Sequence, residues 1–182
     1  FPALENVPQE LAEIQEAFPA SEKFLNEEFT PATIETELQS DFPVVHLATH
    51  GLFSSNPEKN FIVTGDGNKI GLEELSELLK AGATSELDLL VLSACETATG
   101  DERAVLGLAG MAVRSGARST LATLWPVEDD SAAQVMGQFY QQLKQGKSKL
   151  DAFRIAQIEL IESFKTNPPF EELQSLPPHP YY

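Results

Sequence analysis

Two kinds of hydrophobic pattern alternate along this chain. Residues 44–49 and 87–94 are largely apolar runs without polar alternation, a pattern typical of parallel strands that helices cover on both faces. Apolar residues at helical spacing predict helices over residues 72–80, 130–144 and 150–164. Because strands and helices alternate in this way, the pattern predicts an α/β fold with a mainly parallel sheet flanked by helices.

Weaker patterns complete the expected order of elements. Residues 8–18 have the spacing of a short amphipathic helix that ends before Pro19, and residues 23–25 predict a brief strand. Thr30 is a suitable N-cap for a second helix. The other expected elements are a hairpin with its turn at residues 65–68, a glycine-rich helix at residues 104–117 and a strand at residues 119–127.

The last two predicted helices each have an apolar side that is expected to face the core. On the helix at residues 130–144, this side comprises Val135, Met136, Phe139, Tyr140 and Leu143. On the helix at residues 150–164, it comprises Phe153, Ile155, Ile158 and Ile161.

Composition limits the kinds of partner. The chain of 182 residues has 12 Lys and Arg against 28 Asp and Glu, a net charge of −16, so neither nucleic acid nor an anionic membrane surface is expected to bind it. No apolar run approaches the roughly 20 residues that span a bilayer, and the first residues lack a signal-peptide pattern, which favours a cytoplasmic protein. The single cysteine cannot form an internal disulfide. Proteins or peptides are the expected partners.

The cysteine and one histidine follow the two apolar runs. His50 and Cys95 are both expected at the carboxyl ends of parallel strands, where α/β proteins bind ligands. If the two strands are neighbours, their ends lie about 5 Å apart. A thiol beside an imidazole is activated to attack a carbonyl carbon, and the backbone N–H groups of Gly51 and Cys95 are natural donors to the oxyanion that forms. Spacing alone also fits a buried, structural cysteine.

Five longer motifs indicate a family resemblance. The chain contains, in this order, A-T-H-G, L-S-A-C-E-T, L-G-L-A-G, L-W-x-V-x-D-D and F-Y-x-x-L. Together they resemble the CHAT domain, a caspase-like module usually found behind tetratricopeptide repeats in bacterial proteins. The resemblance implies a three-layer fold of the caspase-haemoglobinase type and a Cys-His dyad protease related to caspases, separase and gingipains. It implies His50 as the catalytic histidine, Cys95 as the nucleophile, and Gly51 and Cys95 as oxyanion donors.

The resemblance also predicts how the chain is organised. It is dense over residues 44–160 and weaker over residues 1–42, so residues 1–165 are expected to form the caspase-like domain. Residues 166–182 are a proline-rich segment, and in the family the H-P-Y-Y motif leads into a further strand. The family domain also commonly begins with a strand upstream of Phe1. The chain is therefore expected to be trimmed at both ends, and attached repeat domains of the same or a partner chain are expected to regulate it.

Four further residues are candidates for substrate binding. Asp129 and Asp130 are expected either to cap the helix that follows or, as the resemblance to separase implies, to select a basic residue before the cleaved bond. Ser93 is expected either to close its strand or to line the cleft. Trp125 is expected either to form a wall of the cleft or to pack in the core. Cleavage after Asp is disfavoured, because the arginines that a caspase pocket requires are scattered along this sequence.

Three hypotheses of function remain. The leading one is a cysteine endopeptidase that acts on protein or peptide substrates through His50 and Cys95. The second is a catalytically silent scaffold of the same fold that binds a partner peptide in the same groove. A nucleotide-binding domain is disfavoured, because no glycine-rich phosphate loop follows a strand. One cysteine and three scattered histidines lack metal-ligand spacing, so no metal or cofactor is expected, and His46 is expected to be a core histidine with its polar groups satisfied.

Overall fold

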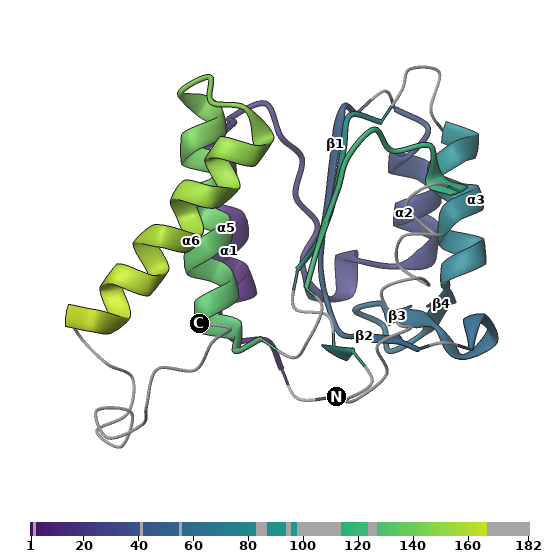
Figure 1. Cartoon of the computed structure of the whole chain (residues 1–182). Helices are drawn as coiled ribbons and strands as arrows, with labels where there is room; N and C mark the ends of the chain where they lie inside the picture. Colours follow the sequence, from purple (N-terminus) through teal and green to yellow (C-terminus); the bar gives the residue numbers. More distant parts are fainter. Residues whose placement is uncertain are drawn as a thin grey trace.

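The described part of the chain has a three-layer α/β architecture. The computed structural model describes Phe1 and residues 3–40, 42–54, 56–82, 87–93, 96–97, 114–123 and 127–166. A three-stranded parallel sheet lies between two layers of helices (Figure 1). The predicted fold class is therefore confirmed, and the architecture agrees with a caspase-like α/β fold.

The parallel sheet contains both apolar runs and one further strand. β5 (Leu89–Ser93) is central, with β1 (Val44–Ala48) on one side and β7 (Thr120–Ala122) on the other, all parallel. Every residue of β5 is buried, which explains why its sequence lacks polar alternation. The register pairs Ala48 with Ser93, so β1 and β5 end side by side at the carboxyl edge of the sheet.

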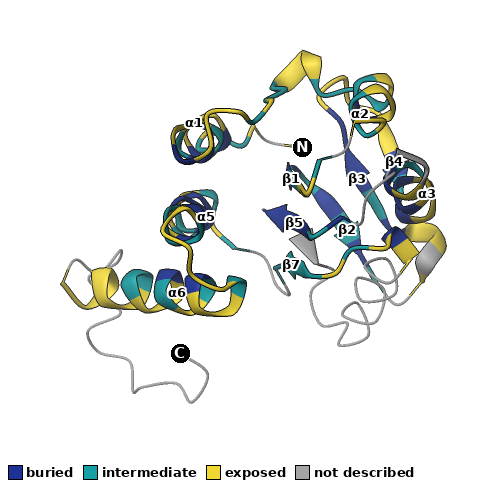
Figure 2. Ribbon diagram, turned by 90° about the horizontal axis from the view of Figure 1, so that it is seen from above, coloured by how far each residue is buried: buried dark blue, intermediate teal, exposed yellow. Residues whose placement is uncertain are grey.

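Helices cover both faces of this sheet. One layer contains α1 (Val7–Ala17), α5 (Asp129–Lys144) and α6 (Lys149–Thr166), and the other contains α2 (Pro31–Glu37) and α3 (Leu72–Gly82). Figure 2 shows the buried residues concentrated on the strands and on the sides of the helices that face inward. The sheet is thus shielded from water on both faces, as a parallel sheet requires.

The two faces of β5 enter two separate hydrophobic cores. Leu90 and Leu92 belong to the core with α2 and α3, whose other buried members are Ile34, Leu47, Phe53, Ile62, Ile70, Leu72, Leu75, Leu79 and Leu87. Leu89 and Val91 belong to the core with α1, α5 and α6, whose other buried members are Ile14, Ala17, Met136, Phe139, Tyr140, Ala152 and Ala156. The predicted apolar side of α5 is therefore confirmed.

A second sheet, made of four short strands, begins where the first one ends. Its strand order is β4 (Lys69–Gly71), β3 (Phe61–Val63), β2 (Gly51–Phe53) and β6 (Glu96–Thr97). β3 and β4 form the predicted hairpin, and Gly67 in its turn has a φ of 81°, which favours glycine. The sequence did not predict β2 and β6, because strands of three and two residues are too short to show a hydrophobic period.

Among the short elements, one predicted strand is absent and one predicted helix cap is present. Residues 23–25 form no strand, because none of the described strands pairs with them; the next element is instead the short helix η1 (Asn26–Glu28). Thr30 caps α2 as predicted, since its Oγ1 accepts a hydrogen bond from the Thr33 N–H at 3.1 Å. A second short helix, η2 (Pro57–Lys59), precedes β3. Residues 94, 104–113 and 124–126 of the predicted elements, and residues 167–182 of the predicted proline-rich segment, lie outside the described part of the chain.

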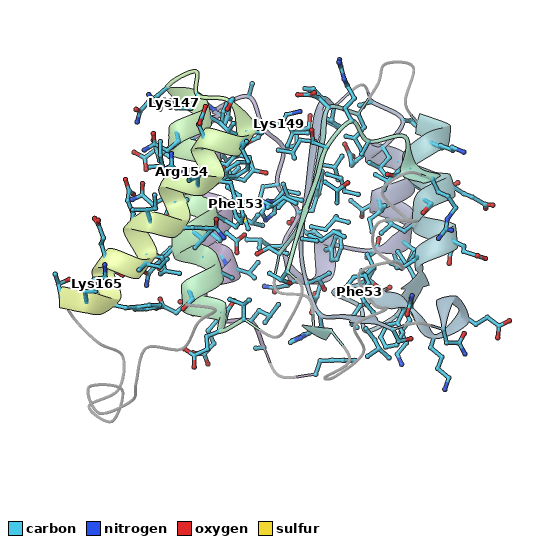
Figure 3. The ribbon with its side chains drawn as sticks, in the orientation of Figure 1. Phe53, Lys147, Lys149, Phe153, Arg154 and Lys165 are labelled. Atoms are coloured by element: carbon cyan, nitrogen blue, oxygen red, sulfur yellow. The ribbon has the colours of Figure 1, made fainter. Side chains whose placement is uncertain are left out.

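The predicted buried side of α6 is wrong at two of its four positions, Ile158 and Ile161. Ile158 and Ile161 have exposed fractions of 40% and 47%, whereas Ala152 and Ala156 are buried. α6 packs against α5 through these small side chains, because small residues let two helices approach closely. Phe153 does face the core, where it meets Phe139 of α5 edge to face with ring centroids 6.2 Å apart (Figure 3). Periodicity selects large apolar residues, but a close helix contact selects small ones.

One buried polar cluster joins three elements. Nε2 of His46, on β1, lies 2.8 Å from Oε1 of Glu10, on α1, and Nδ1 of His46 lies 3.1 Å from the hydroxyl of Tyr140, on α5. The side chains of Glu10 and His46 have exposed fractions of 0% and 8%. The prediction that His46 is a core histidine with its polar groups satisfied is confirmed for Nδ1, which pairs with Tyr140. Nε2 and the Glu10 carboxylate lie within ion-pair distance, but neither makes a hydrogen bond among the described residues.

Burial raises the pKa of the Tyr140 hydroxyl above its ordinary value of 10.0, and the nearby carboxylate of Glu10 raises this pKa further. The folded state therefore holds the Tyr140 proton more tightly than the unfolded state, so this contribution to stability is complete below about pH 10 and is lost as the pH rises further. Tyr140→Phe is expected to reduce that alkaline loss and to cost about 1 kcal/mol at neutral pH. Urea unfolding at neutral and alkaline pH measures both effects, and parallel pH curves for the two proteins would contradict this explanation.

Candidate functional site

The predicted base lies just beyond β1, and the predicted nucleophile follows β5 in the sequence. His50 is two residues past the end of β1 and immediately precedes Gly51, the first residue of β2. Cys95 lies outside the described part of the chain. The nearest described residues on its two sides are Ser93, which ends β5, and Glu96, which begins β6.

Two strand pairings enclose the region of His50. Ala48 of β1 pairs with Ser93 of β5, and Leu52 of β2 pairs with Glu96 of β6. Both pairings are parallel and join neighbouring strands, whose backbones are about 5 Å apart. His50 is therefore the middle residue of a short connection, and both ends of that connection lie beside the described neighbours of Cys95.

Backbone hydrogen bonds hold His50 in place. Its carbonyl oxygen accepts the N–H of Val63, on β3, at 2.8 Å, and the N–H of Thr49 donates to the Ser93 carbonyl at 3.4 Å. The Thr49 hydroxyl also donates to the Val63 carbonyl. The side chain of His50 is half-buried, and its ring stacks on that of Phe1 with centroids 5.2 Å and planes 27° apart. Because the backbone is hydrogen-bonded at both Thr49 and His50, the His50 side chain keeps its position better than a side chain on a free loop would.

The N–H of Gly51 points toward the side of β6. The carbonyl of His50 is bonded to Val63 on β3, and in a trans peptide the C=O and the N–H that follows point in opposite directions. No described peptide bond is cis, so the Gly51 N–H points away from β3 and toward β6, the other neighbour of β2. The predicted donor therefore faces the strand whose first residue, Glu96, directly follows Cys95 in the sequence.

Packing places a second demand on Gly51. A Cβ at this position would lie 3.0 Å from Cε2 of Phe53 and 3.1 Å from the carbonyl oxygen of Phe61, both tighter than ordinary contacts. Gly51→Ala is therefore expected to lower the free energy of unfolding by about 1–3 kcal/mol. Urea unfolding measures this loss. In the matched control Gly71→Ala, the Cβ would meet only the Asn60 carbonyl oxygen at 4.0 Å, and equal losses in both variants would contradict the packing explanation.

Asp129 and Asp130 begin α5, but neither is its N-cap. The N-cap is Glu128, so the capping alternative for the two aspartates is wrong; both already have helical geometry and lie in the first turn. Asp129 instead accepts the backbone N–H of Asn6 through Oδ2 at 2.6 Å, which ties α5 to the residue before α1. Its Oδ1 is buried and has no hydrogen-bond partner among the described residues. Asp130 is exposed, and its Oδ2 accepts a hydrogen bond from Nε2 of Gln134 at 2.7 Å.

Of the other two predicted substrate-binding residues, Ser93 and Trp125, the structure describes only Ser93. Ser93 is fully buried at the end of β5, so its side chain does not reach the surface. Trp125 lies outside the described part of the chain.

A hollow of about 480 Å³ lies between α1, α5 and α6, and Asp130 lines it together with Glu13, Glu16 and Glu159. Neither His50 nor Gly51 lines this hollow, so Asp130 and the candidate base face different regions.

Sequence reasoning missed two contacts at the carboxyl edge of the sheet. Phe1 stacks on His50, and Asn6 donates to Asp129. No hydrophobic period marks Phe1 or Asn6, because both precede the first helix. The only feature of the sequence that could have indicated the Phe1 contact is a lone aromatic residue ahead of that helix.

The described residues contain neither a candidate membrane span nor a candidate metal centre. None of their helices has the length and apolar character needed to cross a bilayer. They also contain no group of three or more His, Cys, Asp or Glu side chains placed to hold a metal ion.

Comparison with known proteins gives one result at the level of the family. The family model of the CHAT domain matches residues 1–182, the whole chain. No curated protein matches the sequence.

Proposed function

This chain belongs to the CHAT domain family, which is often linked to caspase-like peptidases, and from that premise we propose that it is a cysteine endopeptidase. In the proposed site, Cys95 is the nucleophile and His50 is the base. The backbone N–H groups of Gly51 and Cys95 are the oxyanion donors. The substrates are proteins or peptides.

The strand pairings on both sides of His50 are the observation that best supports this proposal. Ser93 and Glu96, the described residues that flank Cys95, pair with Ala48 and Leu52, which flank His50. Cys95 directly precedes Glu96 in the sequence, and consecutive Cα atoms are about 3.8 Å apart. Side chains from backbones separated by about 5 Å can reach each other for proton transfer, directly or after a rotation.

The proposed reaction has two steps. His50 takes the proton of the Cys95 thiol, the thiolate attacks the carbonyl carbon, and the Gly51 and Cys95 N–H groups stabilise the oxyanion. The tetrahedral intermediate collapses to a thioester, and the leaving amine takes the proton from the His50 imidazolium. Water then attacks the thioester while His50 accepts its proton, and the acid product and the free thiol are released.

We extend the proposal to the residue before the cleaved bond, for which a basic side chain is favoured. Asp129 is half-buried, and its Oδ1 is covered and has no hydrogen-bond partner among the described residues, so a Lys or Arg side chain that displaces the covering atoms would supply one. The net charge of −16 also attracts basic peptides. Asp130 is the weaker candidate, because it lines the hollow between the helices.

Active-site labelling tests this proposal. Peptidyl acyloxymethyl ketones that differ only in Arg, Lys or Asp beside the reactive group are incubated with the chain, and mass spectrometry identifies the modified residue. We expect modification at Cys95, faster with the Arg and Lys probes than with the Asp probe. Cys95→Ala is the control for labelling elsewhere.

Two outcomes would count against the proposal. If no probe reacts while iodoacetamide alkylates Cys95 fully, the thiol is accessible but not activated, and the scaffold hypothesis is favoured. If the Asp probe reacts fastest, the peptidase reading stands but the role of Asp129 is wrong.

A further inference from the structure

The ring of Phe1 covers the candidate base. It stacks on the His50 ring with centroids 5.2 Å and planes 27° apart, and it meets Phe61 edge to face with centroids 6.4 Å and planes 74° apart. Phe1 is 68% exposed, so most of its surface faces solvent and the two rings support one side of it. Phe1 thus rests on a small aromatic surface beside the candidate site.

The residues after Phe1 lead to the second candidate region. The Asn6 N–H donates to Oδ2 of Asp129 at 2.6 Å. Figure 1 shows the N-terminal stretch running past the carboxyl edge of the sheet, from near β2 to the foot of the helical layer. One short segment therefore contacts both the candidate base and the candidate specificity residue, with a side chain at one and a backbone N–H at the other. These are the two kinds of group that a bound peptide offers.

The surface beneath Phe1 is built on paired strands. Phe61 lies on β3, which is bonded to β2 on one side and to β4 on the other. Nζ of Lys69 lies 4.0 Å from the centre of the Phe61 ring, a cation–π contact that helps to orient it. The carbonyl of His50 is bonded to Val63 of the same strand. The two rings are therefore expected to keep their spacing when Phe1 leaves.

We propose that the rings of His50 and Phe61 form a subsite for an aromatic side chain of the peptide substrate, and that Phe1 occupies this subsite in the structure. The proposal rests on the proposed peptidase function, which makes the ligand a peptide. Phe1 shows the chemistry of the occupant, because it stacks on the imidazole and makes an edge-to-face contact with Phe61. The segment that contains Phe1 then competes with substrate for the site.

Peptide binding to the Cys95→Ala variant tests this subsite without cleavage. The probes are short capped peptides with one fixed Arg and a single Phe placed at each other position in turn, compared with the same peptides in which Phe is Ala. We expect one Phe position to improve the Kd about three- to tenfold over Ala. Adding Phe1→Ala is expected to tighten binding of that peptide, and adding Phe61→Ala is expected to weaken it to the level of the Ala peptide.

Phe1→Ala and Phe61→Ala are expected to change the peptide Kd in opposite directions. A general loss of structure would weaken binding in both variants. Phe61→Leu keeps an apolar side chain for the case in which Phe61→Ala fails to fold, and it is expected to weaken binding less. Phe164→Ala, at an aromatic residue of α6 that is 36% exposed, is the matched control and is expected to leave binding unchanged. Equal Kd values for the Phe and Ala peptides, or no effect of Phe1→Ala, would overturn the subsite.

The same peptides distinguish the subsite from the proposed function. If the unmodified chain cleaves them without regard to the position of Phe, the peptidase stands and the subsite is wrong. If the binding pattern appears but no peptide is cleaved, the subsite stands and the peptidase is wrong.

Discussion

Replacing His50 by alanine is expected to lower kcat/KM for peptide hydrolysis by roughly 10²–10⁴-fold, the usual contribution of a general base. Cys95→Ala is expected to reduce hydrolysis to the uncatalysed rate, because no other cysteine is present to replace the nucleophile. Initial rates with a fluorogenic peptide that contains Arg before the cleaved bond measure both effects. The bond between the His50 carbonyl and Val63 does not involve the side chain, so His50→Ala is expected to stay folded.

Two controls make this prediction specific. His179→Ala removes another of the three histidines and is expected to keep the parent rate. Alkylation of Cys95 by iodoacetamide gives a readout that does not depend on the choice of substrate. It is expected to slow in His50→Ala at neutral pH, because the imidazole no longer takes the thiol proton. Equal alkylation rates in His50→Ala and the parent would argue against His50 as the base.

Truncating either partner of the contact between Glu10 and His46 is expected to lower the free energy of unfolding by about 3–5 kcal/mol. Both side chains are buried, at exposed fractions of 0% and 8%, so removing one leaves the other polar group without its partner in the core. His46→Ala also removes the contact with the Tyr140 hydroxyl. Because this cluster joins α1, β1 and α5, its loss weakens the attachment of the helical layer to the sheet. Urea unfolding of Glu10→Ala and His46→Ala measures the effect.

A charge-matched control and a double variant complete the test. Glu16→Ala removes a carboxylate from the same helix at an exposed position and is expected to change stability by less than about 0.5 kcal/mol. Glu10→Leu combined with His46→Leu removes both polar groups together and is expected to be less destabilising than the sum of the single leucine variants. Strictly additive losses would show that the two side chains contribute independently and would contradict the cluster.

The sequence predicted an element well where the interactions that determine it are local. Thr30 caps α2 because an N-cap acts within one turn, which a sequence displays directly. β5 was predicted well because burial on both faces leaves an uninterrupted apolar run. The buried side of α6 was not, because a close contact with α5 favours Ala152 and Ala156 over the larger Ile158 and Ile161. Such a choice depends on the surface of another helix.

In the candidate site too, some features could be predicted from the sequence and others could not. The positions of His50 and Cys95 after two apolar runs could be read from the sequence, and so could the motifs around them. The short strands β2 and β6 could not, since their pairing joins segments that are more than forty residues apart. The contact of Asn6 with Asp129 was equally hidden, because it joins residues 123 positions apart and replaces the expected capping role of Asp129.

By itself, the sequence determined the alternation of strands and helices, the acidic charge, the family, and the placement of a histidine and the only cysteine at the ends of apolar runs. These follow from local periodicity and residue chemistry. Only the tertiary structure decided that β1 and β5 are neighbours in parallel register, that the Gly51 N–H points toward β6, and that Phe1 lies on His50. The physical reason is that strand pairing and ring contacts depend on which distant segments share a sheet edge, and no local pattern encodes that choice.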